Sequence, residues 1–461
     1  MKDFGTFFRN ILFLLLFSLV SLVLVFSCKR SSSQISSKTY RCLDCHKIKL
    51  DDKHSFSCTV CHQGKEPAPS ATVAHKNLLA RPAAPAFMEK TCGSCHPEKT
   101  RALKKAPHFT LEKEINLVLK AFGLSTVSSP LALKEPEQIQ NLEDLVHDLL
   151  RRRCLRCHLY YEGDSYAETR RGLGCAACHL PYGNGGLESH TFLSSPPDRN
   201  CLHCHYGNRV GFDYYGMFEH DYPYQFRSPL LEGELPPRPW GVEFHEMQPD
   251  VHLEAGMPCL ACHTGSELME GQKGPQCTDC HRNLPGKFHA PQVLQKAQCS
   301  TCHATWSFQD QGTYLLLHYE PDWEEWAEFY AQGSSEVEEI ISNYFREGKA
   351  KALMKDKFSG RLKAGIWFLG FKKRRFAEIP LGRDDKGRLS VMRPLLDLHL
   401  SLVTPEEEVL FDNISPSKIK KDPKARYLPY SPHTIGQADY FRTQKVLKMT
   451  DERSNFEPQR P

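Results

Sequence analysis

Cys299-Ser-Thr-Cys-His303 is one of nine stretches of this 461-residue chain that follow the pattern Cys-x-x-Cys-His. The other copies begin at Cys42, Cys58, Cys92, Cys154, Cys175, Cys201, Cys259 and Cys277. Together the copies use eighteen of the 19 cysteines and leave only Cys28 outside the pattern. Because all of them lie between residues 42 and 303, the group that they bind must organise this part of the fold.

Cys-x-x-Cys-His is the attachment pattern of c-type haem. Its two cysteines form thioethers to the porphyrin, and its histidine ligates the iron on the proximal side. The expected thioether residues are Cys42, Cys45, Cys58, Cys61, Cys92, Cys95, Cys154, Cys157, Cys175, Cys178, Cys201, Cys204, Cys259, Cys262, Cys277, Cys280, Cys299 and Cys302. The expected proximal ligands are His46, His62, His96, His158, His179, His205, His263, His281 and His303. The sequence therefore predicts nine covalently attached haem c groups, each with its iron.

Three other uses of paired cysteines fit the sequence less well. Structural zinc sites also contain Cys-x-x-Cys pairs, but they do not need a histidine directly after every pair. A disulfide framework uses varied cysteine spacings, whereas all nine pairs here have the same spacing. A thioredoxin-like redox motif occurs once, next to a βαβ unit. Haem attachment is the interpretation that accounts for all nine histidines.

The haem groups are expected to form the core of residues 41–306. Residues 42–303 provide only about 29 residues for each motif, too few for a conventional apolar core. We therefore expect a multihaem cytochrome c fold, mostly short α-helices and irregular loops around a haem core. Removing the haem should unfold this domain, as removing the metal unfolds small metal-binding domains.

Two long gaps, of 62 and 58 residues between motif starts, divide the motifs into three groups of three. Whether these groups are an internal repeat stays open. In the first gap, apolar residues at helical spacing from Leu111 to Phe122 predict one helix. Leu145, Leu149 and Leu150 predict a second helix that runs into Cys154. The second gap, residues 206–258, is rich in Tyr, Pro and Gly and is expected to form loops.

Each iron also needs a sixth ligand or an open position. A second histidine gives a low-spin, low-potential electron carrier, a methionine raises the potential, and an open position admits a substrate. Outside the motifs lie 12 histidines, more than the nine that full bis-histidine ligation requires. The expected distal ligands are His54, His75, His108, His147, His190, His220, His245, His252 and His289. His433 is a further candidate, whereas His203 lies inside a motif and is badly placed to bind its own haem.

The N-terminus resembles an export signal. Lys2 and Arg9 precede an apolar run at residues 11–26, shorter than the about 20 residues that a membrane-spanning helix needs. Ser27 and Cys28 follow at once, as in a bacterial lipoprotein signal. We expect a signal peptide at residues 1–27, with Cys28 lipidated; an uncleaved signal anchor is the alternative.

Two locations follow from that signal. Residues 28–40 would form the lipid anchor and a Ser-rich linker. The haem domain would be extracytoplasmic and membrane-anchored, in the periplasm, at the outer membrane or at the cell surface.

Residues 310–450 contain no motif and are expected to form a small α+β module, with a disordered tail at 451–461. Asp322 to Phe345 predicts a pair of amphipathic helices. A hairpin is expected around Asp384 to Gly387. Leu398, Leu400 and Leu402 alternate with polar residues, as in a strand with one buried face.

A basic run from Lys372 to Arg375 lies within this module. Such a run is usually a solvated face, and that is the expectation here. Binding of an anion or of haem propionates is the other interpretation.

The motifs resemble those of the multihaem c-type cytochromes of anaerobic, often metal-reducing, bacteria. The resemblance extends to His252-Leu-Glu-Ala-Gly-Met-Pro-Cys-Leu-Ala-Cys-His263, to Cys299-Ser-Thr-Cys-His-Ala-Thr-Trp306 and to Ser-Pro-His-Thr around His433. It covers residues 40–306 and is weak beyond them. It implies an exported protein of anaerobic respiration with mostly bis-histidine haems. Reductases of this kind often carry a lysine in the motif of the catalytic haem, whereas all nine motifs here end in histidine.

The leading hypothesis is a non-catalytic electron carrier that connects a membrane or periplasmic donor with a terminal acceptor. The alternative is a multihaem reductase of an oxyanion or nitrogen compound, with one open-coordinate haem. A third hypothesis is a subunit of a larger cytochrome complex. The expected partners are redox proteins and, through the lipid, a membrane. A net charge of +4 provides no strong field for nucleic acid.

Overall fold

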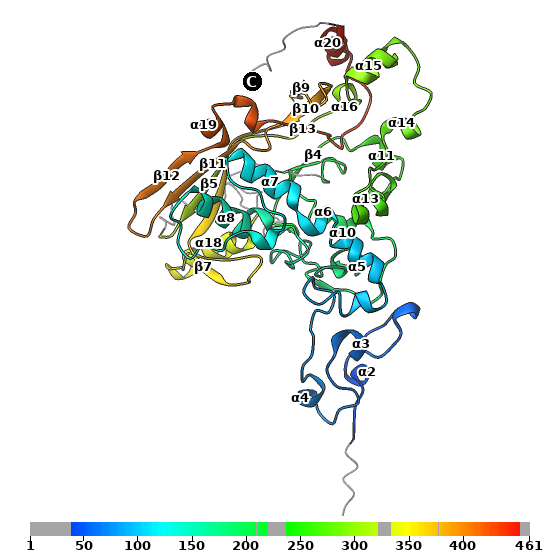
Figure 1. Ribbon diagram of the computed structural model, residues 1–461, viewed down its shortest axis with the longest axis vertical. Coiled ribbons are helices and arrows are strands. Elements are labelled where there is room, and N and C mark those ends of the chain that lie inside the picture. Colours follow the sequence, from blue (N-terminus) through cyan, green and yellow to red (C-terminus); the bar gives the residue numbers. More distant parts are fainter. Residues whose placement is uncertain (1–37, 209–210, 220–236, 321–332, 377, 452–461) are drawn as a thin grey trace, which may run out of the picture. The chain divides into compact units, whose positions relative to one another are not determined.

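The computed structural model describes residues 38–208, 211–219, 237–320, 333–376 and 378–451 (Figure 1). The predicted signal peptide, Cys28 and residues 452–461 of the predicted tail lie outside these ranges. Within the described ranges, we find no helix with the length and apolar character needed to cross a membrane.

The chain divides into two compact units. The first comprises Met1–Lys47 and Gly64–Leu78, of which residues from 38 onward are described. It contains the short helices α2 (Cys42–Cys45) and α4 (Ala71–Ala74). Tyr40 and Ala68 exchange backbone hydrogen bonds and hold the two segments together.

The second unit comprises Ile48–Gln63 and Leu79–Pro461, with eight of the nine motifs. Its motifs lie in single turns of helix, because cysteines at i and i+3 followed by a histidine at i+4 fit one turn. These turns are α3 (Thr59–His62), η2 (Cys92–Ser94), η4 (Cys154–Arg156), α9 (Ala176–His179), α10 (Asp198–Leu202), α12 (Cys259–Cys262), α14 (Cys277–Cys280) and α16 (Ser300–His303). Short helices and turns connect them, as expected for this region.

The connecting elements are brief. The helices are η1 (Asp52–His54), α5 (Pro97–Leu103), α6 (Pro107–Thr110), η3 (Pro130–Ala132), α11 (Val251–Glu254), α13 (Gly265–Glu270), η6 (Lys287–His289) and α15 (Pro291–Lys296). The strands form two small antiparallel pairs, β1 (Tyr182–Gly183) with β2 (Gly186–Leu187) and β3 (Met217–Glu219) with β4 (Phe244–Glu246). The predicted loop region at 206–258 therefore contains one strand pair and α11.

Both helices predicted in the first long gap are confirmed. They are α7 (Glu112–Ala121) and α8 (Leu142–Arg152), and α8 leads directly into the motif at Cys154. Asn141 caps α8 by accepting a hydrogen bond from the Asp144 N–H. Leu145 and Leu149 are fully buried in the largest apolar cluster of the protein.

The motif-free residues contain a four-stranded sheet in the order β12-β11-β5-β8. Its strands are β5 (Gln309–His318), β8 (Ile366–Arg375), β11 (Leu398–Val403) and β12 (Val409–Ile414). β5 pairs antiparallel with β8 and parallel with β11. Leu400 and Leu402 are buried while Ser401 is partly exposed, so the predicted alternation is confirmed.

A three-stranded sheet and several helices complete this region. The sheet has the order β13-β10-β9, from β9 (Leu381–Arg383), β10 (Leu389–Arg393) and β13 (Leu428–Tyr430). Its β9–β10 hairpin encloses Asp384 to Gly387, as predicted. The remaining elements are α18 (Ser335–Glu347), β6 (Leu353–Lys355), β7 (Leu362–Ala364), α19 (Pro416–Lys420), η7 (Pro423–Arg426) and α20 (Tyr440–Asp451).

Two sequence-based expectations for this module need comment. Of the predicted helix pair at 322–345, the second is α18, whereas residues 321–332 lie outside the described ranges. The basic run at the end of β8 is not a uniformly solvated face. Arg374 has a side chain only 4% exposed and forms ion pairs with Glu219 and Asp310, because the sheet brings these carboxylates beside it.

The motif-free residues belong to the same compact unit as eight of the motifs. The reason is the large apolar cluster, to which α7, α8, α18 and the four-stranded sheet all contribute (Figure 1). Ile115 and Leu145 pack there with Trp367 and Leu400. The helix that precedes the motif at Cys154 is thus buried against the module.

Candidate functional site

Histidines face each other in seven pairs, each made of one motif histidine and one histidine from outside the motifs. Their ring centres are 6.0–6.3 Å apart. The pairs are His46 with His75, His96 with His54, His62 with His190, His205 with His108, His281 with His252, His263 with His433, and His303 with His289. The first pair lies in the first unit and the other six in the second.

This separation fits one iron between two imidazoles. An imidazole nitrogen binds a transition metal at about 2 Å and lies about 1 Å from the ring centre, so two rings on opposite sides of one iron have centres about 6 Å apart. Ordinary ring packing gives a wider spread of separations, about 4.5–7 Å. The donor set and its spacing therefore fit haem iron with two axial histidines at seven motifs.

Hydrogen bonds to Nδ1 fix the orientation of many of these rings. Asp51 caps η1 and lies 2.9 Å from Nδ1 of His54, and Asp250 caps α11 and lies 2.7 Å from Nδ1 of His252. Nδ1 of His303 lies 3.1 Å from the Gly436 carbonyl oxygen. Acceptors at Nδ1 keep the proton there, which leaves Nε2 available to a metal.

The predicted distal ligands divide into three groups. Six of them face a motif histidine: His54, His75, His108, His190, His252 and His289. His147 is buried on α8, where its Nδ1 accepts a hydrogen bond from the Lys134 N–H, and His245 stacks on Phe218. His220 lies outside the described residues.

His433 faces His263, although the sequence ranked it below the nine. Its place in the motif-free region, 130 residues after the last motif, hides this role, and the Ser-Pro-His-Thr context is the one signal for it. The His433 N–H donates to Asp213 Oδ2 at 3.0 Å, so the motif-free region is bonded to the haem region at this point.

Two motif histidines, His158 and His179, face no other histidine among the described residues. His179 keeps the ligand-type contact, since its Nδ1 lies 2.7 Å from the Leu193 carbonyl oxygen. His203 makes the same kind of contact, with Nδ1 2.7 Å from the Glu168 carbonyl oxygen. The Nε2 atom of His203 is buried without a hydrogen-bond partner and is thus available to a metal.

Cysteines of successive motifs lie in hydrogen-bonding or electrostatic contact. The contacts are Cys61 with Cys92, Cys92 with Cys175, Cys178 with Cys201, Cys201 with Cys259, Cys262 with Cys280, and Cys277 with Cys299. They place seven motifs of the second unit in one line. The motif at Cys154 joins this line from the side, because Cys157 contacts Cys204.

Arg171 fastens this side motif to its neighbour. Its guanidinium donates to the carbonyl oxygens of Arg156 at 2.6 Å and of His203 at 3.4 Å, one from each motif. The side chain is 3% exposed, and every hydrogen-bond acceptor that it reaches is a backbone carbonyl.

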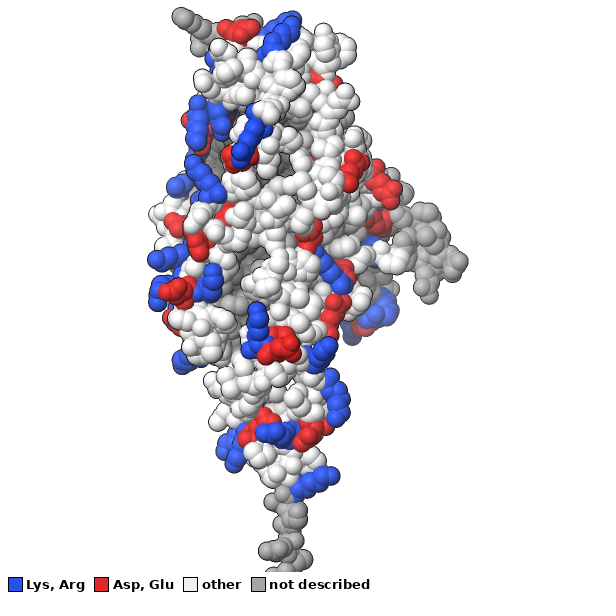
Figure 2. Space-filling model, turned by 90° about the vertical axis from the view of Figure 1, so that its right-hand side faces the viewer, with Lys and Arg blue, Asp and Glu red and all other residues white. Residues whose placement is uncertain are grey.

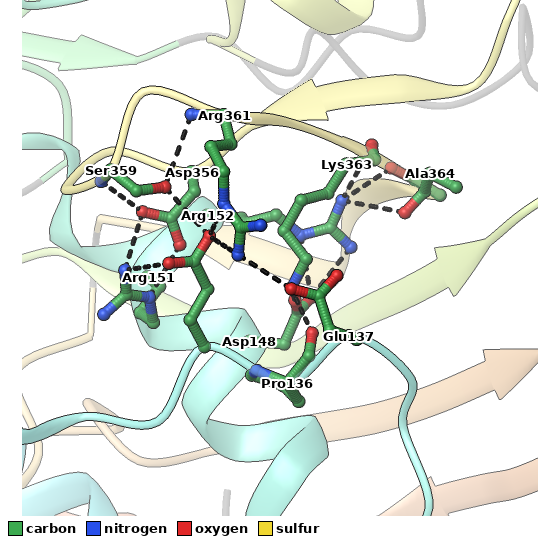
Figure 3. A network of polar contacts seen from close by, with 12 residues as sticks. Pro136, Glu137, Asp148, Arg151, Arg152, Asp356, Ser359, Arg361, Lys363 and Ala364 are labelled. Carbon is green, nitrogen blue, oxygen red and sulfur yellow. Dashed lines mark hydrogen bonds and ion pairs between the residues drawn. The ribbon is translucent and has the colours of Figure 1, made fainter.

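A buried polar network joins α8 to the β6–β7 hairpin of the motif-free module (Figure 3). Arg151 donates to both carboxylate oxygens of Asp356, at 2.6 and 2.9 Å. Arg152 donates to Asp148 at 2.8 Å and to the carbonyls of Ala364 and Gly365. Burial raises the pKa of Asp356, but hydrogen bonds from Arg151 and two backbone N–H groups outweigh it and hold this pKa below its ordinary value.

The alternatives to haem fit the geometry poorly. Across the described ranges, no four cysteine or histidine ligand atoms converge as a tetrahedral zinc site requires. No disulfide joins any of the eighteen motif cysteines. On the face drawn in Figure 2, basic and acidic side chains are intermingled, so this face offers no extended positive surface for nucleic acid.

Comparison of the chain with models of protein families, with curated proteins and with solved structures finds no match.

Proposed function

We propose that the protein is an electron-transfer cytochrome that holds nine haem c groups, most of them with two axial histidines. The seven facing histidine pairs are the observation that carries this proposal. Each haem would supply one iron that accepts and releases a single electron. The chain's own residues hold these groups, set their axial ligands and fix their order.

The order of the motifs supports a conducting role. The contacts between cysteines run from the motif at Cys58 to the motif at Cys299. Because each haem is bonded to its cysteines, neighbouring cysteines require neighbouring porphyrins. An electron that enters near Cys58 could therefore leave near Cys299, some 240 residues further along the chain.

The axial histidines support low-potential carriers rather than nine substrate sites. Carbonyl and carboxylate acceptors at Nδ1 make an imidazole a stronger donor to iron and stabilise the oxidised state. A donor and an acceptor outside the cytoplasm are part of the proposal, with the anchor at Cys28 and a larger cytochrome complex as further elements.

The test is a haem count combined with a reductive titration. The mass of the purified protein should exceed that of the processed polypeptide by nine haem groups. Stepwise reduction should change the spectrum of low-spin haem over a broad range of potentials, as expected for many similar carriers. A mass equal to that of the bare polypeptide, or a protein that binds zinc in place of haem, would overturn the proposal.

A further inference from the structure

The motif at Cys154 has a backbone conformation that the other eight motifs do not share. In those eight, the N–H of the histidine donates to the carbonyl of the first cysteine at 2.8–3.0 Å. In η4 this bond is not formed, since Leu155 leaves the helical region with φ −85° and ψ 41°. The motif histidine, His158, is therefore presented in a different way.

The ring of His158 is also held differently. Its Nδ1 lies 3.0 Å from the Tyr160 N–H, a donor, whereas Nδ1 of His62, His179 and His303 faces a carbonyl oxygen. His158 is 2% exposed, and its Nε2 is buried without a hydrogen-bond partner. An unpartnered buried nitrogen costs about 1–3 kcal/mol, so a metal bond at Nε2 would satisfy this ring.

Aromatic rings occupy the surroundings of His158. Phe358 stacks on the imidazole with ring centres 4.2 Å apart and planes 11° from parallel. Tyr160 and Tyr161 follow at 5.8 and 6.2 Å. Phe358 belongs to the motif-free module, and the Arg151–Asp356 ion pair places it there. The module thus supplies a wall of this site and no histidine.

Positive charge surrounds the same ring. Arg151, Arg171 and Lys357 all interact electrostatically with His158, against a single carboxylate, Asp356. Arg151 and Lys357 have carboxylate partners of their own, whereas Arg171 bonds only to backbone carbonyls. Its Nε is buried without a hydrogen-bond partner. The site therefore retains a positive charge that an anion can neutralise.

We propose that the haem bound at Cys154, Cys157 and His158 is the ligand-binding centre of the protein and that it takes a small anion at an open iron position. The inference rests on the proposed function, since it assumes that haem is attached. Its place beside the line of motifs suits a site that exchanges electrons with the line through the motif at Cys201. His179 has the ligand-type contact at Nδ1 and belongs to the line, so we assign it to the six-coordinate haems.

The first test is electron paramagnetic resonance of the oxidised holoprotein, with the haem count measured on the same sample. We expect nine haems and a high-spin signal that accounts for one of them. Nine haems without a high-spin signal would overturn the open site and leave the electron-transfer proposal standing. Absence of haem would overturn both.

A matched pair of substitutions locates the open haem. Phe358→Leu removes the ring stacked on His158, and Phe56→Leu removes a ring 6.0 Å from the paired His54. Phe358→Leu should change the high-spin signal alone, and Phe56→Leu should change a low-spin signal alone. A Phe358→Leu protein with an unaltered high-spin signal would show that the open haem lies elsewhere.

The charge of the ligand is tested with azide on the oxidised protein and carbon monoxide on the reduced protein. Lys357→Met removes one buried positive charge near His158 and should weaken azide binding roughly tenfold while leaving carbon monoxide binding unchanged. Unchanged low-spin signals confirm that the variant is folded. Equal effects on the two ligands, or none on azide, would overturn the assignment to anions.

Discussion

The imidazoles of His263 and His433 lie with their ring centres 6.0 Å apart, although 170 residues separate them in the chain. The segment that carries His433 is held by Asp213, which accepts hydrogen bonds from the His433 N–H and from the Tyr430 hydroxyl. Residues far beyond the last motif therefore take part in ligation. The motif-free module cannot be regarded as a separate appendage.

Replacing His433 with alanine should convert one six-coordinate haem into a high-spin haem. The reason is that His263 then faces no second imidazole. The measurement is the high-spin signal in electron paramagnetic resonance, which should grow by one haem. His399→Ala is the matched control, since His399 lies in the same module but bonds to Asp397 and Asn413. An equal signal in both variants would contradict the ligand role.

Asp356→Ala should lower the free energy of unfolding by about 3–5 kcal/mol, because it leaves Arg151 buried and unpaired. Both side chains are almost fully buried, at 7% and 0% exposure. Asp385→Ala, at an exposed position of the β9–β10 hairpin, should change stability by less than about 0.5 kcal/mol. Urea unfolding monitored by tryptophan fluorescence would measure both.

Acid should weaken the same ion pair in a defined pH range. The pKa of Asp356 is lower in the folded protein than in the unfolded chain, so its ionised form stabilises the fold. This contribution is complete above about pH 4, near the unfolded value, and is lost as the pH falls through the lower folded pKa. The difference in urea midpoint between wild type and Asp356→Asn should be constant from pH 7 to 5 and should shrink below pH 4. A difference that grows on acidification would contradict this sign.

The sequence predicted those parts of the site that depend on local spacing. The motif turns, α7, α8 and the β9–β10 hairpin follow from periodicity and turn residues close together in the chain. Six of the nine expected distal histidines also face a motif histidine, and most of these lie within about 30 residues of a motif.

The sequence could not rank the histidines whose positions depend on tertiary contacts. His147 has the spacing of a ligand, but the turn at Lys134 uses its Nδ1. His433 is brought to His263 by Asp213, which no local pattern reveals. The exceptional conformation at Leu155 is equally hidden, because the motif letters at Cys154 are the same as in the other eight.

His203→Ala should add one high-spin haem to the spectrum of the oxidised protein. His203 has Nδ1 bonded to the Glu168 carbonyl and a buried, unpartnered Nε2, the arrangement of an axial ligand. Its helix lies against the motif at Cys175, since Asn200 donates to the carbonyls of Cys178 and Leu180. We therefore expect His203 to serve the haem of His179. An unchanged spin state would assign it a purely structural role.

Arg171→Lys should loosen the side motif from the line while keeping the charge. Arginine presents five donors in a planar fork, whereas a lysine ammonium cannot reach carbonyls in two motifs at once. Leaving a buried carbonyl unsatisfied costs about 1–3 kcal/mol, so the melting temperature should fall. Arg346→Lys, at an exposed position on α18, should leave the melting temperature unchanged.

The decisive measurement for Arg171 is kinetic. If the contact between Cys157 and Cys204 is the route to the His158 haem, its loosening should slow reduction of the high-spin haem after rapid mixing with a reductant. The low-spin haems of the line should be reduced at the wild-type rate. Slowing of all haems together would show that Arg171 stabilises the whole unit and does not control this branch.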